Sequence, residues 1–166
     1  MKRTLQVLNN LKREGIISDY AIGGGVAALF YAQPTLTYDL DVFILLAESQ
    51  EGKLVSLGPI YNSLRSKGYK PHKEYVEIEG VSVQFLPASN QLQEEAVKEA
   101  LVKRYEGTPI RVLRPEHLIA IAVQIGRAKD KARVSLLREQ AKLDVHYLDA
   151  ILERYNLKET FTKWTL

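Results

Sequence analysis

Up to about residue 113, segments whose apolar residues have helical spacing alternate with segments that have strand spacing. After that residue, only helical spacing is found. Leu5, Leu8 and Leu11 share one helical face, which predicts a helix over residues 3–14 that stops at Gly15. Runs of β-branched and aromatic residues predict strands at residues 20–22, 39–45, 74–78, 81–86 and 110–113. All of the expected strands therefore precede the helical end of the chain.

Three further helices are predicted among these strands, at residues 26–31, 59–67 and 90–104. The third begins at Asn90 and Gln93, whose spacing is typical of a capping box. Pro115 stands where another helix begins, and the remaining chain predicts helix in three or four pieces, one of them capped by Asp144.

This order of elements predicts an α/β (α+β) fold, in which a small mixed sheet is flanked by helices and followed by a C-terminal helical segment. We expect residues 1–113 to form the α/β core and residues 114–166 to form a helical segment packed on it. The length of 166 residues, with 46% hydrophobic and 26% charged residues, suits such a globular protein.

Composition excludes several kinds of site. The chain contains no Cys, so it has no disulfide, no thiolate nucleophile and no cysteine-built zinc or iron–sulfur centre. The longest apolar run, Leu118–Val123, is far shorter than the roughly 20 residues that span a bilayer. The segment after Met1 lacks a signal-peptide core, so we expect a cytoplasmic protein that makes no membrane contact.

Positive charge gathers in one segment. The whole chain has a net charge of +3, whereas residues 126–142 contain six Lys or Arg against two Asp or Glu. These bases are Arg127, Lys129, Lys131, Arg133, Arg138 and Lys142. Such a segment favours either an exposed helix face or an anion site, and a position beside a helix start makes Arg127 and Lys129 the better candidates for binding phosphate.

Two acids stand at the start of the expected strand over residues 39–45. Residues two apart in a strand point to the same face, so Asp39 and Asp41 project side by side while Leu40 faces the core. Carboxylates held this close repel each other, and each raises the pKa of the other unless a cation lies between them. Mg²⁺ suits such a pair, because it binds through one or two carboxylates together with substrate phosphates.

Three consecutive glycines precede this pair. Without side chains, Gly23, Gly24 and Gly25 let backbone N–H groups approach a phosphate chain, and the helix expected after them directs its positive end to the same place. An anion site and a cation site are then adjacent, which is what phosphoryl or nucleotidyl transfer requires.

The glycines and the Asp-x-Asp pair together resemble the nucleotidyltransferase superfamily, which includes DNA polymerase beta and the minimal bacterial nucleotidyltransferases. Its hallmark is a Gly-Gly or Gly-Ser pair that ends a strand and opens a helix, followed by Asp-x-Asp on the next strand. Residues 21–29 and 37–43 look most like the abortive-infection (AbiEii-type) toxin branch, whose pattern is Gly-Gly-x-Ala and then Thr-x-Asp-hydrophobic-Asp. Residues 111–120 and 126–130 resemble later segments of that branch more faintly.

The resemblance implies a nucleotidyltransferase fold and a transfer of NMP from a nucleoside triphosphate such as ATP to a hydroxyl of RNA or protein. It implies that Asp39 and Asp41 hold Mg²⁺ and that the glycines bind the triphosphate. Arg127 and Lys129 would be further phosphate contacts. The most specific expectation from the resemblance is a toxin-like role, with an antitoxin protein as partner.

This sequence departs from the branch at four positions. The strand that should carry a third carboxylate has Gln84 in its place, and an amide cannot accept a proton. The other three positions hold Ala122 where the branch has Lys, Thr35 where it has Arg, and Arg133 near where it has an acid. These departures weaken the expectation of catalysis and leave that of the fold unchanged.

Alternatives therefore remain. The chain could be a catalytically degenerate module that binds a nucleotide or a partner, or an unrelated α/β protein in which the motif is accidental. Glu77 and Glu79, on the strand before Gln84, are candidates to replace the missing acid. Near the motif, Tyr20, Tyr31 and Tyr38 are expected to be packing residues, although one of them could stack on a nucleobase.

Overall fold

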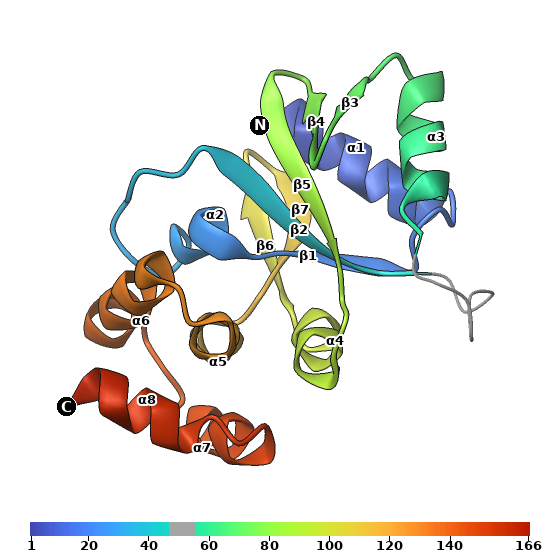
Figure 1. Ribbon diagram of the computed structural model, residues 1–166. Helices are drawn as coiled ribbons and strands as arrows, with labels where there is room; N and C mark the ends of the chain where they lie inside the picture. The colour runs from blue at the N-terminus through green and yellow to red at the C-terminus, as the bar shows by residue number, and fades with distance from the viewer. Residues whose placement is uncertain (47–55) are drawn as a thin grey trace.

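The computed structural model describes residues 1–46 and 56–166, and in them seven strands form one mixed sheet with the order β3-β4-β5-β2-β1-β7-β6 (Figure 1). The strands are β1 (Asp19–Ile22), β2 (Asp39–Leu45), β3 (Pro71–His72), β4 (Tyr75–Ile78), β5 (Val81–Pro87), β6 (Leu101–Tyr105) and β7 (Thr108–Val112). The central strand β2 runs antiparallel to β1 and parallel to β5, and β1 runs parallel to β7. The mixed sheet predicted from the sequence is confirmed.

Helices cover both sides of this sheet. They are α1 (Lys2–Arg13), α2 (Gly24–Ala28), α3 (Gly58–Ser66), α4 (Gln91–Lys98), α5 (Pro115–Ile125), α6 (Ala128–Gln140), α7 (Val145–Arg154) and α8 (Lys158–Thr165). In Figure 1, α1 and α3 lie on one side of the sheet and α4 and α5 on the other, with α7 and α8 outermost. The short helix α2 follows β1 directly and contacts β2.

Helix α5 shows how the C-terminal helices join the core. Every residue from Pro115 to Val123 is buried, and α5 contacts α2, α4, α6 and α7. The apolar run at residues 118–123 is thus the interior of a core helix. Among the described residues, no helix is long and apolar enough to cross a membrane. The division at residue 113 stays a prediction.

The helix predicted for residues 90–104 is wrong in its second half. Helix α4 ends at Lys98, and residues 101–105 form the edge strand β6, in which half-buried and exposed residues alternate. A tight turn joins β6 to β7, with positive φ at Glu106 (47°) and Gly107 (81°), the backbone that two-residue hairpins require. Helical spacing of Ala96 and Ala100 suggested a longer helix, but pairing with β7 determines the strand.

The helix predicted for residues 26–31 is shorter and begins earlier. Helix α2 starts at Gly24 and ends at Ala28. After it the chain tightens into three-residue turns, in which the N–H groups of Leu29 and Phe30 donate to Val26 and Ala27. The strand β3, of two residues, was also not predicted, because so short an element has no periodicity to read.

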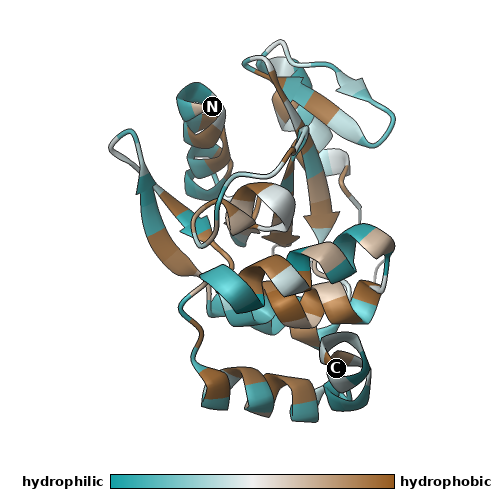
Figure 2. Ribbon diagram, turned by 90° about the vertical axis from the view of Figure 1, so that its left-hand side faces the viewer, coloured by the Kyte–Doolittle hydropathy of each residue, from teal (hydrophilic) through white to brown (hydrophobic). Residues whose placement is uncertain are grey.

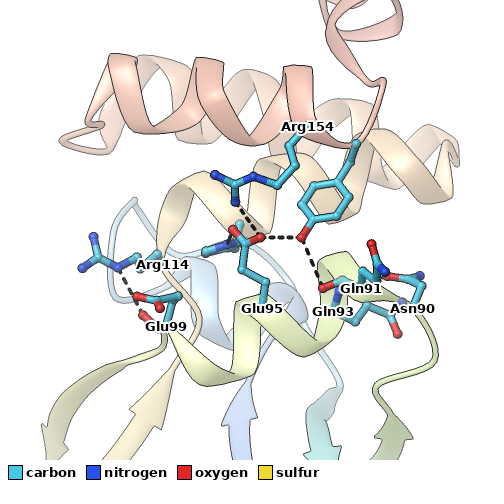
Figure 3. Close-up of polar contacts among 9 residues, drawn as sticks. Asn90, Gln91, Gln93, Glu95, Glu99, Arg114 and Arg154 are labelled. Atoms are coloured by element: carbon cyan, nitrogen blue, oxygen red, sulfur yellow. Dashed lines mark hydrogen bonds and ion pairs between the residues drawn. The ribbon is translucent and has the colours of Figure 1, made fainter.

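A polar cluster around Glu95 ties the outer helix α7 to α4 and α5 (Figure 3). Glu95 Oε1 lies 3.1 Å from Nε2 of the fully buried His117, and Glu95 Oε2 accepts a hydrogen bond from Arg154 Nη1 at 2.7 Å. The Tyr155 hydroxyl donates to the same carboxylate oxygen. Burial raises the pKa of Glu95, but the bonds from Tyr155, Arg154 and His117 outweigh it and hold that pKa below its usual value.

We predict that Glu95→Gln lowers the free energy of unfolding at pH 7 by about 2 kcal/mol, because the bonds it accepts lose their charged partner. A carboxyl whose pKa is lowered by folding stabilises the protein above its unfolded pKa, and that contribution is lost as the pH falls through the folded value. The difference between variant and wild type should therefore shrink below about pH 4. Urea unfolding across this pH range measures it.

The control is Glu99→Gln, which removes the same charge from an exposed position at the end of the same helix. It should change the free energy of unfolding by no more than about 0.5 kcal/mol. Equal losses in the two variants would contradict the role given to the Glu95 cluster.

Candidate active site

The glycine bend and the two acids meet where β1 ends and β2 begins. The strands pair with Ile22 opposite Val42, and one residue further on the Gly23 N–H donates to the Asp41 carbonyl oxygen at 2.9 Å. Along β2, Asp39 is exposed, Leu40 is buried and Asp41 is half-buried, so the two acids lie on one face. The bend after β1 therefore lies alongside the Asp41 side chain.

Each of the three glycines makes room for a side chain of β2 or of the segment before it. Gly24 has φ +60°, and a Cβ on it would lie 2.1 Å from Asp41 Oδ2. A Cβ on Gly23 would lie 2.5 Å from the Phe43 ring, and one on Gly25 would lie 2.8 Å from Thr37 Oγ1. The space occupied by the Asp41 carboxylate thus depends on the missing side chain of Gly24, a reason the sequence did not reveal.

A cleft of about 720 Å³ opens over this face of the sheet. Of the residues proposed from the sequence, its lining includes Gly25, Asp39, Asp41, Arg127 and Lys129. The other two proposed glycines lie behind that lining, packed against β2 and the core. Both acids and both bases, separated by 85 residues or more in the sequence, are therefore brought to one cleft.

The start of α6 brings the bases into place. Helix α5 ends at Gly126 in the left-handed conformation (φ 80°), and Arg127 then caps α6. The buried carboxylate of Asp130 accepts hydrogen bonds from the Arg127 backbone N–H at 3.1 Å and from Arg127 Nε at 2.7 Å. Asp130 Oδ1 also pairs with Arg133 Nη1 at 3.5 Å. One buried acid therefore holds two guanidinium groups at the edge of the cleft.

Arg133 is a further cleft residue, which the sequence marked only as one of the six bases of residues 126–142 and as a departure from the resembled branch. Its side chain is 20% exposed, lines the cleft, and has Nη2 3.8 Å from the place that a Cβ on Gly25 would occupy. The spacing of three residues from Asp130 on one helix could have indicated that the two side chains meet. Nothing in the local sequence indicated that Arg133 faces Asp41.

Burial and charge act on Asp41 in opposite directions. Burial, the largest influence, raises the pKa of its carboxyl, whereas Arg133, Lys129 and Arg127 lower it. Asp39 adds a further rise, so the Asp41 pKa lies above its ordinary value. A carboxylate in this state gains from any cation that enters the cleft.

The position of Gln84 agrees with the departure noted in the sequence. Strand β5 runs parallel to β2 with Gln84 directly opposite Asp41, and both line the cleft. In the described part of the chain, no group of three His, Asp or Glu side chains lies close enough to hold a metal. Glu79 is bound elsewhere, by the Tyr69 hydroxyl at 2.7 Å and by Arg3, and Glu77 is not part of the cleft lining.

The other residues noted in the sequence, Tyr38, Thr35 and Ala122, lie in different surroundings. Tyr38 was expected to pack against the core, but it is 78% exposed and lines the cleft. Thr35 also lines the cleft, whereas Ala122 is buried in the core helix α5. The expectation that Tyr38 packs is therefore wrong, because it lies just after an exposed segment, residues 33–36, that leads toward β2.

Comparison with known proteins shows the fold of this chain. No family model matches it, and no curated protein matches it in sequence. A nucleotidyltransferase-like antigenic protein from Paracoccidioides brasiliensis superimposes with a TM-score of 0.57 at 14% identity, covering 97% of this chain and 93% of its own.

Two structures of the antibiotic-resistance factor ANT(2'')-Ia are also similar. Its solution structure has a TM-score of 0.55 at 16% identity and covers 98% of this chain and 95% of its own. Its crystal structure in complex with adenylyl-2''-tobramycin has a TM-score of 0.52 at 14% identity and covers 99% of this chain and 98% of its own. The chain therefore has the fold of these nucleotidyltransferase-like proteins over nearly its whole length.

We predict that Gly24→Ala destabilises the protein more than Gly15→Ala. Both glycines have positive φ (60° and 72°), but a Cβ on Gly15 meets nothing within 4 Å, whereas one on Gly24 meets Asp41. Gly15→Ala should cost about 1 kcal/mol of unfolding free energy, from the backbone alone. Gly24→Ala should cost roughly 1–3 kcal/mol more, from the clash. Equal losses in urea unfolding would contradict the packing of Asp41 on Gly24.

We also predict that Asp41→Asn raises the melting temperature of the ligand-free protein at pH 7. Because folding raises the pKa of Asp41, the charged form opposes folding, and that cost is absent below its unfolded pKa. The advantage of the variant should therefore vanish as the pH falls to about 3.5, where the wild-type carboxyl is protonated. Thermal melts in metal-free buffer measure it, and a lower melting temperature at pH 7 would contradict it.

Proposed function

We propose that the protein is a Mg²⁺-dependent nucleotidyltransferase that moves NMP from a nucleoside triphosphate to a hydroxyl group. The observation that carries this proposal is the cleft itself: Asp39 and Asp41 face Arg127 and Lys129 across it, on a nucleotidyltransferase-like fold. Paired carboxylates opposite paired bases suit a ligand that is a metal-bound polyphosphate.

The residues present fit one magnesium ion. Asp39 and Asp41 lie on one face of β2, and the Gln84 side chain, opposite Asp41, adds an amide oxygen to a donor set made of hard oxygen ligands. The raised pKa of Asp41 shows a carboxylate that is undercompensated by the bases around it. When bound, the ion would neutralise the triphosphate and polarise its α-phosphate.

The bases and the bend have separate tasks in this proposal. Arg127 and Lys129 bind the β- and γ-phosphates, and Asp130 keeps Arg127 in place by accepting hydrogen bonds from its backbone N–H, Nε and Nη2. The Gly25 N–H, in the first turn of α2 and at the cleft lining, has no carbonyl partner within the helix and is available to the same anion. These contacts orient the α-phosphate for attack by the acceptor hydroxyl.

The proposed transfer requires no side chain of the protein as proton acceptor. The hydroxyl oxygen forms a bond to the α-phosphorus, the bond to the bridging oxygen breaks, and pyrophosphate leaves with the electron pair. The hydroxyl proton passes to solvent, because the amide of Gln84 cannot accept it. A site that lacks this base works more slowly than one that has it, on the order of 100-fold.

The acceptor is the finer part of the proposal. We infer a hydroxyl of RNA or protein, by the resemblance of residues 21–43 to the AbiEii-type toxin branch. The crystal structure of ANT(2'')-Ia, which holds an adenylylated product, supports transfer to a hydroxyl acceptor on this fold. A toxin-like role with an antitoxin partner, in the cytoplasm, belongs to the same proposal.

A second candidate function is nucleotide binding without turnover. Gln84 favours it, because its position opposite Asp41 is where a third carboxylate would serve as the base. Calorimetry with Mg²⁺ and ATP separates the two functions, since a module that only binds gives heat of binding and no transfer. The same titration, repeated with each nucleoside triphosphate separately, identifies the preferred nucleobase.

We predict that the wild type transfers label from an α-³²P-labelled nucleoside triphosphate to cell RNA or protein when Mg²⁺ is present. Asp39→Asn and Asp41→Asn should each reduce the rate at least about 100-fold, because each removes a metal ligand. Gel autoradiography after incubation with each of the four triphosphates measures the transfer.

Glu77→Gln is the matched control, since it removes a carboxylate on β4, two strands away from Asp39, that is not part of the cleft lining. It should leave the rate within about twofold of the wild type. A wild type that labels nothing while it binds Mg²⁺ and ATP would favour the binding module. A Glu77→Gln variant that loses activity would show that this acid, and not solvent, takes the proton.

A further inference from the structure

Some enzymes that displace a group at phosphorus use two metal ions about 4 Å apart, held by several carboxylates. The cleft in this chain has fewer acids and more bases in its lining than such a pair of ions would require. Beside Asp41, the neighbouring strand offers the neutral Gln84. Arg133 lines the same cleft, on the side of Gly25 and Thr37. The balance of charge around Asp41 therefore shifts toward positive before any ligand binds.

Arg133 is held rather than free. Asp130, fully buried, pairs with its Nη1, and only 20% of the Arg133 side chain is exposed. Its Nη2 lies 3.8 Å from the position of a Cβ on Gly25, so the guanidinium stands over the glycine bend. A guanidinium keeps its charge at any physiological pH and offers five N–H donors in a fixed plane.

We propose that this site binds one divalent cation rather than two, and that the Arg133 guanidinium, over the glycine bend beside Asp41, supplies the positive charge of the second. The inference rests on the proposed function and specifies how its site is charged. Asp39 and Asp41 hold the single cation together with the triphosphate. Arg133 binds a non-bridging phosphate oxygen through two N–H groups.

Charge repulsion explains why a second cation and the Arg133 guanidinium would not both lie beside Asp41. A second dication next to Asp41 would share that carboxylate with the first and would lie near a fixed guanidinium. Like charges this close, in a partly buried cleft, repel strongly. A third carboxylate would offset that repulsion, and at the position opposite Asp41 this chain has Gln84. The departure at Gln84 and the departure at Arg133 thus compensate each other.

The test counts Mn²⁺ ions bound per protein in the presence of α,β-methylene-ATP, which cannot release pyrophosphate. Electron paramagnetic resonance measures free Mn²⁺, and calorimetry measures the affinity for the nucleotide. The wild type should bind one Mn²⁺ for each nucleotide at saturation. The double variant Gln84→Glu/Arg133→Gln should bind two, because it gains a carboxylate and loses the guanidinium.

Single variants separate the two parts of the inference. Arg133→Gln should still bind one Mn²⁺ but should weaken nucleotide affinity about tenfold or more, the value of a charged hydrogen bond. Arg133→Lys should recover part of that loss, since it keeps the charge without the planar fork. Arg138→Gln, on the same helix with its guanidinium over the Phe161 ring at 5.8 Å, is the control and should leave the affinity unchanged.

Three results would overturn the inference. Two Mn²⁺ ions per nucleotide in the wild type would show that Arg133 does not replace a metal, while leaving the proposed function intact. An Arg133→Gln variant with wild-type affinity would show that the guanidinium does not touch the nucleotide. A wild type that binds neither Mn²⁺ nor nucleotide at millimolar concentration would overturn the proposed function and this inference together.

Discussion

The contact between Gly24 and the Asp41 carboxylate is the constraint on which the cleft depends. The two strands pair so closely at this point that the Gly23 N–H bonds to the Asp41 carbonyl oxygen, which leaves no room for a side chain on the next residue. The chain can turn there only because glycine tolerates a positive φ. The same turn starts α2 and sets the acidic side of the cleft against the bend.

The basic side of the cleft depends on the helices beneath it. Gly126 ends α5 so that α6 leaves at an angle, and Asp130 fixes Arg127 and Arg133 over the acids. Helix α5 is itself buried among four other helices, and Glu95 connects it with α4 and α7 through His117 and Arg154. In Figure 2, the helices below the sheet carry brown, apolar stretches between teal, polar ones, and α5 itself is buried at every position from Pro115 to Val123. The charged groups are therefore placed by packing far from the cleft.

Much of the fold could be predicted from the sequence, because apolar residues recur with clear helical or strand spacing in most of its elements. The alternation around Asp39 and Asp41 gave the face on which both acids lie, and Pro115 gave the start of the helical region. The edge strand β6 was missed because its hairpin partner, and not its own residues, determines it. The role of Arg133 and the exposure of Tyr38 depend on contacts between distant elements, which local patterns do not carry.

Helix α6 has a second face, which points away from the acids. Lys131 lies over the indole of Trp164 at 5.2 Å, two residues along from Lys129 of the cleft, and Trp164 is the single tryptophan of the chain. A shift of α6 toward an anionic ligand moves a charge relative to that ring. If occupation of the cleft shifts α6, the intrinsic fluorescence of Trp164 on the last helix would report it without any added dye.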